Sequence, residues 1–318
     1  MLLAGIDIGT LTCRLLIADV TGNFSLTEIE SDRQILRLGE GVAQKRYLST
    51  AAMSRVGKTM ILWRARMQRY PLAGSVVVAT SAVREASNRE EFLAYVRREV
   101  GFKIEVLSGE EEAQRTLLGI QSGLPAKVGS FLGIDIGGGS TEFMRVHKPQ
   151  LTAPPQLFSL DVGVVSLTER VFHSGDPPSE QAVFAAEGII RTELERIRLA
   201  LGDLTDVTCV GTAGTITTLA AMAQKLSSYE PARIHNYQLD FGTIQQLERE
   251  LRMQTRSARR ELPGLEQGRE DVIIAGTVIL REVMQILGFR RCLVSNYGLR
   301  EGILVEKAAR IRSSNSQV

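Results

Sequence analysis

The pentapeptide GIDIG occurs twice in this chain, at residues 5–9 and again at residues 133–137. Each copy lies in a short apolar run that favours a strand, and strand-forming residues follow each one. A motif that recurs only once, at residue 5 and again at residue 133, predicts a duplicated domain rather than a solenoid. Short apolar runs alternate with longer amphipathic ones along the rest of the chain, which indicates an α/β architecture.

The length of 318 residues exceeds one ordinary core and suits two domains. Residues 122–130 are rich in small and turn-forming residues, so we expect one domain over 1–124 and another over 125–318, whose C-terminal helix can dock on the first. A net charge of +2 gives no general affinity for polyanions, and we expect no DNA partner. The absence of a leader-like or membrane-length apolar segment, with only three scattered cysteines, predicts a cytoplasmic protein without a membrane partner.

Glycine-rich turns hold phosphate because the backbone can approach closely and point several N–H groups at one anion. No lysine follows the glycines at 137–139, as a P-loop requires, and the strand formers Thr141 and Phe143 stand where a dinucleotide fold needs a helix. The glycines therefore predict a strand–turn–strand hairpin. The alternative, a purely structural hairpin, stays open, above all for the first copy. Asp7 and Asp135 end the first strand of each hairpin and are candidate ligands of a hydrated Mg²⁺.

Three helices are expected, two of them with recognisable start signals. A helix is expected over about 49–69, capped by Ser49 or Thr50, and a long one over roughly 179–201. The helix that follows Asn88 has the spacing Asn-x-x-Glu, which predicts reciprocal capping between Asn88 and Glu91.

A fourth helix opens at SGEEEA, residues 108–113, with three carboxylates in its first turn. Ser108 and Glu111 have the spacing of a capping box, and Glu110 is favourably placed for the helix dipole. Glu112 is not needed for the cap.

Taken together, these motifs resemble the exopolyphosphatase/guanosine pentaphosphate phosphatase (Ppx/GppA) family of the actin-like ATPase superfamily, over nearly the whole chain. The residues that carry the resemblance are GIDIG (5–9), ATSAVREASN (79–88), IEVLSGEEEA (104–113), GIDIGGGSTEF (133–143), GTAGT (211–215) and YGLREG (297–302). The resemblance implies an α/β fold of two actin-like (ribonuclease H-like) domains with a cleft between them. It also implies that the helical domain which longer members carry at the C-terminus is absent here.

The activity implied by the resemblance is Mg²⁺-dependent hydrolysis of the terminal phosphoanhydride of inorganic polyphosphate. Glu112 matches the general base of the family, Arg84 matches an arginine that can clamp phosphate, and Glu142 matches a residue linked to the metal and water site. The metal ligands implied are Asp7, Asp135 and Glu142. The phosphate-binding residues implied are Gly9, Thr10, Thr12, Gly137, Gly138, Gly139, Ser140, Gly211, Thr212 and Gly214.

Several alternatives remain open at this point. Guanosine pentaphosphate presents the same terminal phosphoanhydride as polyphosphate, so sequence does not separate the two substrates. Phosphotransfer to an acceptor and non-catalytic sensing of polyphosphate or an alarmone are the other two classes, and a homodimer is left open. Leu11 replaces an amide side chain of the family pattern, and Asn296 replaces an aspartate.

A run of arginines near the C-terminus provides one further candidate. Arg249, Arg252, Arg256 and Arg260 recur at helical spacing and predict one basic stripe. Such a stripe could guide a polyanionic chain, and the alternative is an ordinary solvated helix face.

Overall fold

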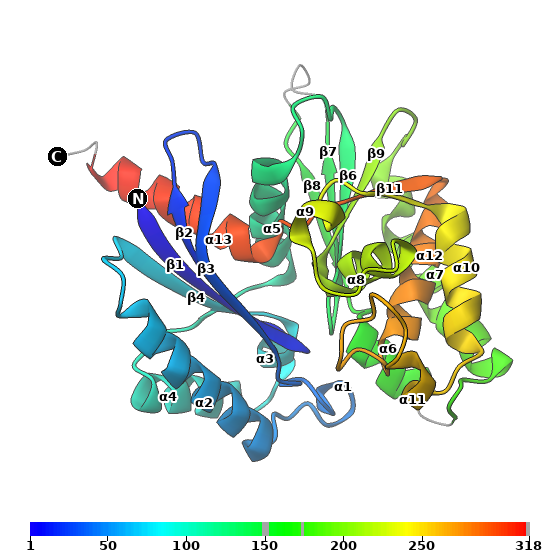
Figure 1. Ribbon diagram of the computed structural model, residues 1–318, viewed down its shortest axis with the longest axis horizontal. Coiled ribbons are helices and arrows are strands. Elements are labelled where there is room, and N and C mark those ends of the chain that lie inside the picture. The colour runs from blue at the N-terminus through cyan, green and yellow to red at the C-terminus, as the bar shows by residue number, and fades with distance from the viewer. Residues whose placement is uncertain (148–152, 173–174, 316–318) are drawn as a thin grey trace. The chain divides into compact units, whose positions relative to one another are not determined.

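The computed structural model describes residues 1–147, 153–172 and 175–315, and the chain divides into two compact units. The first unit combines Met1–Gly123 with Tyr297–Val318, and the second spans Leu124–Asn296. Each unit is built on a mixed β-sheet flanked by helices (Figure 1). The predicted α/β fold class is therefore confirmed.

The first unit contains a five-stranded sheet in the order β3-β2-β1-β4-β5. Its strands are β1 (Leu2–Ile8), β2 (Thr12–Val20), β3 (Leu26–Ile35), β4 (Gly74–Ala79) and β5 (Glu105–Val106). The first three strands are antiparallel neighbours, whereas β1, β4 and β5 run parallel. The carboxyl ends of these three parallel strands therefore meet at one edge of the sheet.

Helices cover both faces of this sheet. They are α1 (Val42–Lys45), α2 (Thr50–Met67), α3 (Ser81–Glu85), α4 (Arg89–Glu99), α5 (Gly109–Gly123) and α13 (Leu299–Asn315). Figure 1 shows α2 and α4 on one side and α13 with α5 on the other. Trp63 and Phe92 are fully buried against the first face, and Leu304 packs with Leu3 on the second.

Two glycines allow α5 and α13 to pack with their backbones in contact. A Cβ on Gly119 would lie 1.8 Å from the carbonyl oxygen of Gly298, and a Cβ on Gly302 would lie 1.6 Å from that of Arg115. The buried guanidinium of Arg115 adds an ion pair to Glu306 of α13 at 2.8 Å. The YGLREG motif thus fixes the helix on which Glu112 lies.

The second unit contains a six-stranded sheet in the order β10-β11-β9-β6-β7-β8. Its strands are β6 (Phe131–Ile136), β7 (Thr141–Val146), β8 (Gln156–Leu160), β9 (Thr208–Thr212), β10 (Gln238–Asp240) and β11 (Arg291–Val294). Its helices are α6 (Val164–Val171), α7 (Glu180–Leu201), α8 (Ala213–Ala223), α9 (Pro231–Ile234), α10 (Phe241–Arg252), α11 (Arg256–Arg259) and α12 (Ile273–Leu287). The strand β6 is antiparallel to β7 and parallel to β9, so it occupies the same place in its sheet as β1 in the first.

Local capping signals are confirmed in one helix and wrong in another. Ser49 caps α2, because its hydroxyl accepts a hydrogen bond from the amide of Ala52 at 3.2 Å. Asn88 precedes α4 but makes no capping bond. Its side-chain amide instead binds both backbone groups of Leu48, at 2.9 and 3.0 Å. A partner distant in sequence therefore outcompetes the local cap.

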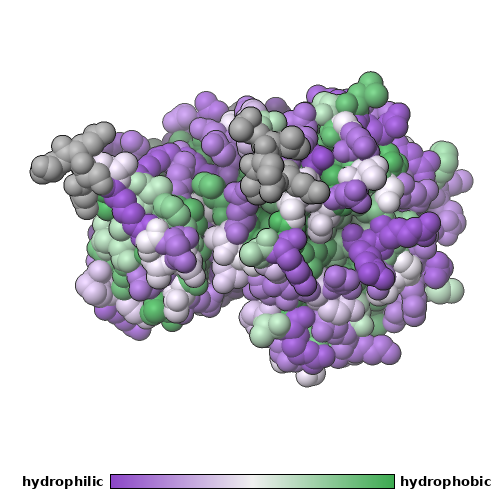
Figure 2. Space-filling model, turned by 90° about the horizontal axis from the view of Figure 1, so that it is seen from above, coloured by the Kyte–Doolittle hydropathy of each residue, from purple (hydrophilic) through white to green (hydrophobic). Residues whose placement is uncertain are grey.

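Hydrophilic residues predominate on the face seen in Figure 2, with hydrophobic residues interspersed in small groups. The large exposed apolar side chains are spread over several elements, among them Leu62 of α2 and Phe184 of α7. None of the helices in the described part of the chain has the length and apolar character required to cross a membrane.

Candidate active site

Both GIDIG motifs lead into the same tight turn between antiparallel strands. In the first hairpin the amide of Gly9 donates to the carbonyl of Thr12 at 3.0 Å. In the second, the amide of Gly137 donates to the carbonyl of Ser140, also at 3.0 Å. A Cβ on Gly9 would lie 2.8 Å from the Thr12 carbonyl oxygen, so the turn needs glycine there. The predicted strand–turn–strand geometry is confirmed for both copies.

The carbonyls of the second turn are bonded to the start of α6. The first two amides of this helix donate to the carbonyls of Gly137 and Gly138, at 3.0 and 2.8 Å. In the same helical turn, the hydroxyl of Ser166 donates to the carbonyl of Gly139 at 3.2 Å. The carbonyl side of this glycine turn is therefore satisfied by the protein itself.

Gly163 makes this close approach possible. A Cβ at this position would lie 2.5 Å from the backbone of Gly138 and of Gly139. Sequence reasoning missed both Gly163 and Ser166. The available signal was a glycine placed directly before the amphipathic helix at 164–171.

The first turn is held in the same manner by the segment 36–39. Two successive amides of this segment donate to the carbonyl of Leu11, at 3.0 and 2.9 Å, and the amide of Gly39 donates to that of Thr10 at 2.9 Å. A Cβ on Gly39 would lie 2.3 Å from the methyl carbon of Thr10. Leu11 itself is buried, so an apolar side chain suits the position where the family pattern has an amide.

The amide side of each turn makes no hydrogen bond within the described ranges. The amides concerned are those of Thr10, Leu11, Gly138, Gly139 and Ser140. The hydroxyl oxygen of Thr10 is also buried and has no partner in the described part of the chain. Buried polar groups are normally paired, and unbonded amides in a glycine turn are the groups with which a backbone holds an anion.

The carboxylate of Glu112 meets the guanidinium of Arg84 beyond the parallel strands of the first unit. Arg84 lies on α3 directly after β4, and Glu112 lies on α5 shortly after β5. The Nη1 of Arg84 donates to Glu112 Oε2 at 3.0 Å and to the carbonyl oxygen of Leu107 at 2.9 Å. Glu112 is only 8% exposed. Because ligands of α/β sheets bind outside the carboxyl ends of the strands, this buried ion pair lies where a substrate is expected.

The other two carboxylates of this helix start are accounted for structurally. The Glu111 carboxylate accepts a hydrogen bond from the Ser108 amide at 2.8 Å, and the Glu111 amide donates to the Ser108 hydroxyl at 3.2 Å. The Ser108 amide and then its hydroxyl hold the pKa of Glu111 below its ordinary value. The predicted capping box is confirmed, and Glu110 is exposed beside it.

The GTAGT segment at 211–215 forms the turn from β9 into α8. Ala213 has a φ of 69°, in the left-handed region that is costly for a residue with a Cβ. A Cβ on Gly214 would lie 2.0 Å from Nη2 of Arg269, so the backbone passes directly against a guanidinium. Thr212 pairs with Asp135 across parallel strands, which brings this turn and the second hairpin to the same edge of the sheet.

The two hairpins differ in the residue that faces the aspartate across the strand pair. Asp135 is directly opposite Glu142, whereas Asp7 is directly opposite Arg14. Directly opposite residues share a face of the sheet with Cβ atoms within about 5.5 Å, and like charges so placed are destabilising. A bound cation would remove that repulsion in the second hairpin. In the first, Arg14 already supplies a positive charge.

This acidic pair fits the ligand requirements of Mg²⁺, which takes one or two carboxylates and completes its shell with water and phosphate oxygens. Glu142 is fully buried and Asp135 is half-buried. No group of three or more histidine, cysteine or acidic side chains that could hold a metal occurs in the described ranges. A site here would therefore have the two carboxylates as its protein ligands, with water completing the shell until a substrate binds.

The four arginines predicted to form one helical stripe do not share a helix. α10 ends at Arg252, and α11 begins at Arg256. Between them Thr255 starts the new helix, because its hydroxyl accepts from the amide of Ala258 at 3.2 Å. The single stripe is therefore wrong, since a Thr N-cap overrides the spacing of the arginines.

Three of these four arginines form ion pairs with acidic side chains, and Arg249 is exposed. The pairs are Arg252 with Glu180 (2.5 Å) and Glu248 (3.3 Å), Arg256 with Asp271 (3.3 Å), and Arg260 with Glu270 (2.8 Å). A polyanion would have to compete with these carboxylates, and the polyanion track stays a prediction.

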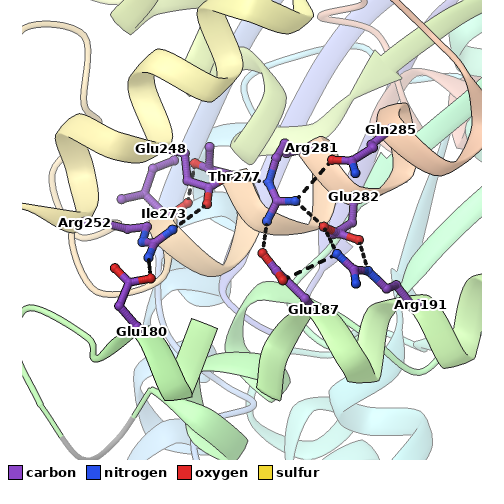
Figure 3. A network of polar contacts seen from close by, with 10 residues as sticks. All are labelled: Glu180, Glu187, Arg191, Glu248, Arg252, Ile273, Thr277, Arg281, Glu282 and Gln285. Carbon is purple, nitrogen blue, oxygen red and sulfur yellow. Dashed lines mark hydrogen bonds and ion pairs between the residues drawn. The ribbon is translucent and has the colours of Figure 1, made fainter. Parts of the chain in front are cut away.

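Arg252 also borders a buried charge network that links α7, α10 and α12 (Figure 3). At its centre, Arg281 Nε binds Glu248 at 2.7 Å and Nη2 binds Glu187 at 2.6 Å. Its Nη1 binds Glu282, which is fully buried. Burial disfavours the charged form of Arg281, but the surrounding carboxylates outweigh burial and raise its pKa above the ordinary value.

Comparison with known proteins identifies the family. The model of the Ppx/GppA phosphatase family matches residues 16–311. The chain belongs to the Ppx/GppA phosphatase family. As a member, the protein is a hydrolase, and the resemblance read from its motifs is confirmed.

Relatives and solved structures agree with this assignment. Exopolyphosphatase 2 of Mycobacterium tuberculosis is 34% identical over 318 residues, which cover 96% of this chain and 98% of the relative. A bifunctional 3-dehydroquinate synthase/phosphatase of Fusobacterium nucleatum is 32% identical, over 95% of this chain and 46% of the relative. The crystal structure of an exopolyphosphatase-like protein matches with a TM-score of 0.90 at 29% identity, covering 98% of this chain and 100% of the other. The Ppx/GppA protein of Aquifex aeolicus matches with a TM-score of 0.80 at 31% identity, covering 98% of each chain.

Replacing Gly163 by alanine is expected to displace the second glycine turn, because the added methyl group would overlap the Gly138 backbone. Overpacking of this kind lowers the free energy of unfolding by about 1–3 kcal/mol. We expect the dissociation constant for tripolyphosphate, measured by calorimetry, to rise at least about tenfold. A rise of that size corresponds to the loss of about one hydrogen bond to a charged group. Gly188→Ala, in α7 with open space around its Cβ, is the matched control. It should lower neither the free energy of unfolding nor the affinity for tripolyphosphate. An unchanged affinity in Gly163→Ala would contradict the role given to this contact.

The charge network makes a separate prediction for stability. Arg281→Ala removes the guanidinium that joins Glu187, Glu248 and Glu282, and breaking buried pairs costs about 3–5 kcal/mol in comparable sites. Glu282 then keeps only Arg191, and Glu248 only Arg252, among the ion pairs of the described residues. Urea unfolding followed by circular dichroism should show this loss. The exposed Arg249→Ala on α10 should stay within about 0.5 kcal/mol. If Arg281→Ala also lowers the free energy of unfolding by no more than about 0.5 kcal/mol, the network does not hold the helices together.

Proposed function

We propose that this protein is an exopolyphosphatase, which removes the terminal phosphate of inorganic polyphosphate as orthophosphate with Mg²⁺. The observation that carries the proposal is the buried Glu112 carboxylate, held by Arg84 beyond the carboxyl ends of β4 and β5. Family membership supports the reaction class, and the Mycobacterium tuberculosis relative named an exopolyphosphatase supports the substrate.

Glu112 acts in the proposed reaction as the general base. It takes a proton from a water molecule as the water oxygen attacks the terminal phosphorus. The bond between that phosphorus and the bridging oxygen breaks, and the bridging oxygen stays on the shortened chain. The capping box assigns Ser108 and Glu111 to the helix start, and Glu110 is exposed, so Glu112 is the buried carboxylate of this turn without a capping role.

Arg84 both orients the base and binds the substrate in this proposal. Only its Nη1 is engaged in the described structure, by Glu112 and by the Leu107 carbonyl. A guanidinium has five N–H donors in a planar fork, so those on Nε and Nη2 remain for phosphate oxygens. The same side chain can therefore hold Glu112 in place and bring the phosphate close to it.

The glycine turns bind the phosphate chain through their unbonded amides. In the first hairpin we assign phosphate binding to Gly9, Thr10 and Thr12. Thr10 supplies an unbonded amide, whereas the amide of Gly9 is bonded to Thr12 and closes the turn. The corresponding residues of the second unit are Gly137, Gly138, Gly139, Ser140, Gly211, Thr212 and Gly214. Because their carbonyls are already bonded within each unit, the turns need little reorganisation when an anion binds. Fixed dipoles of this kind stabilise charge as it develops in the transition state.

Asp135 and Glu142 would hold Mg²⁺, with Asp7 as a further candidate ligand. The bound ion would neutralise charge on the phosphate oxygens. The apposed carboxylates of the second hairpin support this assignment more strongly than Asp7 does, because Asp7 faces Arg14. The same groups would act on guanosine pentaphosphate, which presents the same terminal bond.

The decisive experiment measures orthophosphate release from long-chain polyphosphate and from guanosine pentaphosphate with Mg²⁺. Glu112→Gln should lower kcat by at least about 100-fold, the lower end of general-base contributions, while binding stays within about threefold. Glu110→Gln, the exposed carboxylate of the same helical turn, is the matched control and should keep kcat within about twofold.

Each outcome has a separate meaning. Release from guanosine pentaphosphate alone would reassign the substrate, and formation of ATP from ADP and polyphosphate would reassign the reaction to phosphotransfer. Tight binding without any phosphate release would indicate a sensor. A Glu112→Gln variant with the kcat of the native enzyme would exclude Glu112 as the base.

A further inference from the structure

Four polar residues form a row across the sheet of the second unit. Thr212, Asp135, Glu142 and Ser159 are paired in turn across the neighbouring strands β9, β6, β7 and β8. Residues paired in this way project from the same face of a sheet. The row therefore consists of two adjacent carboxylates with a hydroxyl at each end.

The hydroxyl of Ser159 is hydrogen-bonded to the buried carboxylate. Ser159 Oγ donates to Glu142 Oε1 at 2.8 Å, and Glu142 is fully buried. A buried carboxylate needs donors to remain charged, and a hydrogen bond to an ionised group is about twice as strong as a neutral one. Ser159 thus supplies a hydrogen-bond donor to the carboxylate that the proposed function makes a metal ligand.

The same bond sets the direction in which Glu142 points. Its Oε1 is engaged by Ser159 of β8, and its Oε2 lies 4.0 Å from the place that a Cβ on Gly137 would take. One oxygen is therefore held towards β8, and the other is directed to the glycine turn. Outer partners of this kind fix the orientation of metal-ligating carboxylates.

We propose that Ser159 is a positioning residue of the active site, which holds Glu142 directed to the glycine turn so that Glu142 and Asp135 together can bind the divalent cation. The inference rests on the proposed function, in which Glu142 is a metal ligand. It adds a residue that belongs to none of the motifs read from the sequence.

The first unit provides an internal contrast. Its corresponding row pairs Asp7 with Arg14 and Arg14 with Arg33. A second carboxylate and a serine hydroxyl therefore occur together only in the second hairpin of the two. This joint occurrence is expected if the serine is there to bond the glutamate beside it rather than to stabilise the strand.

The test compares Ser159→Ala with Ser159→Thr, which keeps a hydroxyl on the same strand position. Mn²⁺ binding to the substrate-free protein, measured by electron paramagnetic resonance, should weaken about 10–100-fold in Ser159→Ala. Ser159→Thr should stay within about threefold of the native protein, because it retains a donor. Ser75→Ala, an exposed serine on β4 of the other unit, is the control for loss of a strand hydroxyl and should leave Mn²⁺ affinity unchanged.

Activity and stability supply the remaining readouts. The Mg²⁺ concentration for half-maximal phosphate release should rise in Ser159→Ala by a similar factor, with Tm within about 3 °C of the native protein. If the native enzyme releases phosphate but Ser159→Ala has the native Mn²⁺ affinity and Mg²⁺ dependence, the inference is wrong and the proposed function stands. If the native protein binds Mn²⁺ but hydrolyses neither substrate, the proposed function fails, and the Mn²⁺ affinities still decide the role of Ser159. A native protein that binds no Mn²⁺ also overturns the inference.

Discussion

A glycine turn binds a phosphate when its amides point at the anion and its carbonyl oxygens, which would repel the anion, point away. Hydrogen bonds to the carbonyls hold them in that direction. Both hairpins of this protein meet that condition. The segment 36–39 binds the carbonyls of the first turn, and the start of α6 binds those of the second. Gly39 and Gly163 make these contacts sterically possible. The candidate site therefore depends on two short backbone contacts that none of the glycine motifs contains.

The two copies share the turn and differ in charge. Beside the conserved backbone bond, the first copy pairs its aspartate with Arg14, and the second pairs its aspartate with Glu142. The first hairpin thus carries a positive charge next to its aspartate, whereas the second concentrates negative charge that a divalent cation can neutralise. The two turns are alike, and the difference at one strand position gives their aspartates different partners.

How much the sequence predicts depends on how far apart the interacting residues lie. The turn at Gly9 and the capping box at Ser108 involve residues three positions apart, and both were predictable. Asn88 was predicted wrongly because its side chain bonds to Leu48 on a distant segment. Arg84 on α3 and Glu112 on α5 meet because the strands that precede them, β4 and β5, are neighbours in the sheet. No rule of sequence spacing reveals such a pair. Only the family resemblance pointed to those two residues, and the contact of Gly163 with the turn was not anticipated at all.

The central claim, hydrolysis by attack of water on the terminal phosphorus, is tested most directly by isotope transfer. Polyphosphate is digested in water enriched in ¹⁸O, and the released orthophosphate is examined by mass spectrometry. Attack at the terminal phosphorus predicts one solvent oxygen in each orthophosphate, with the remaining chain unlabelled. Unlabelled orthophosphate, or solvent oxygen found in the shortened chain, would place the attack elsewhere and contradict the account.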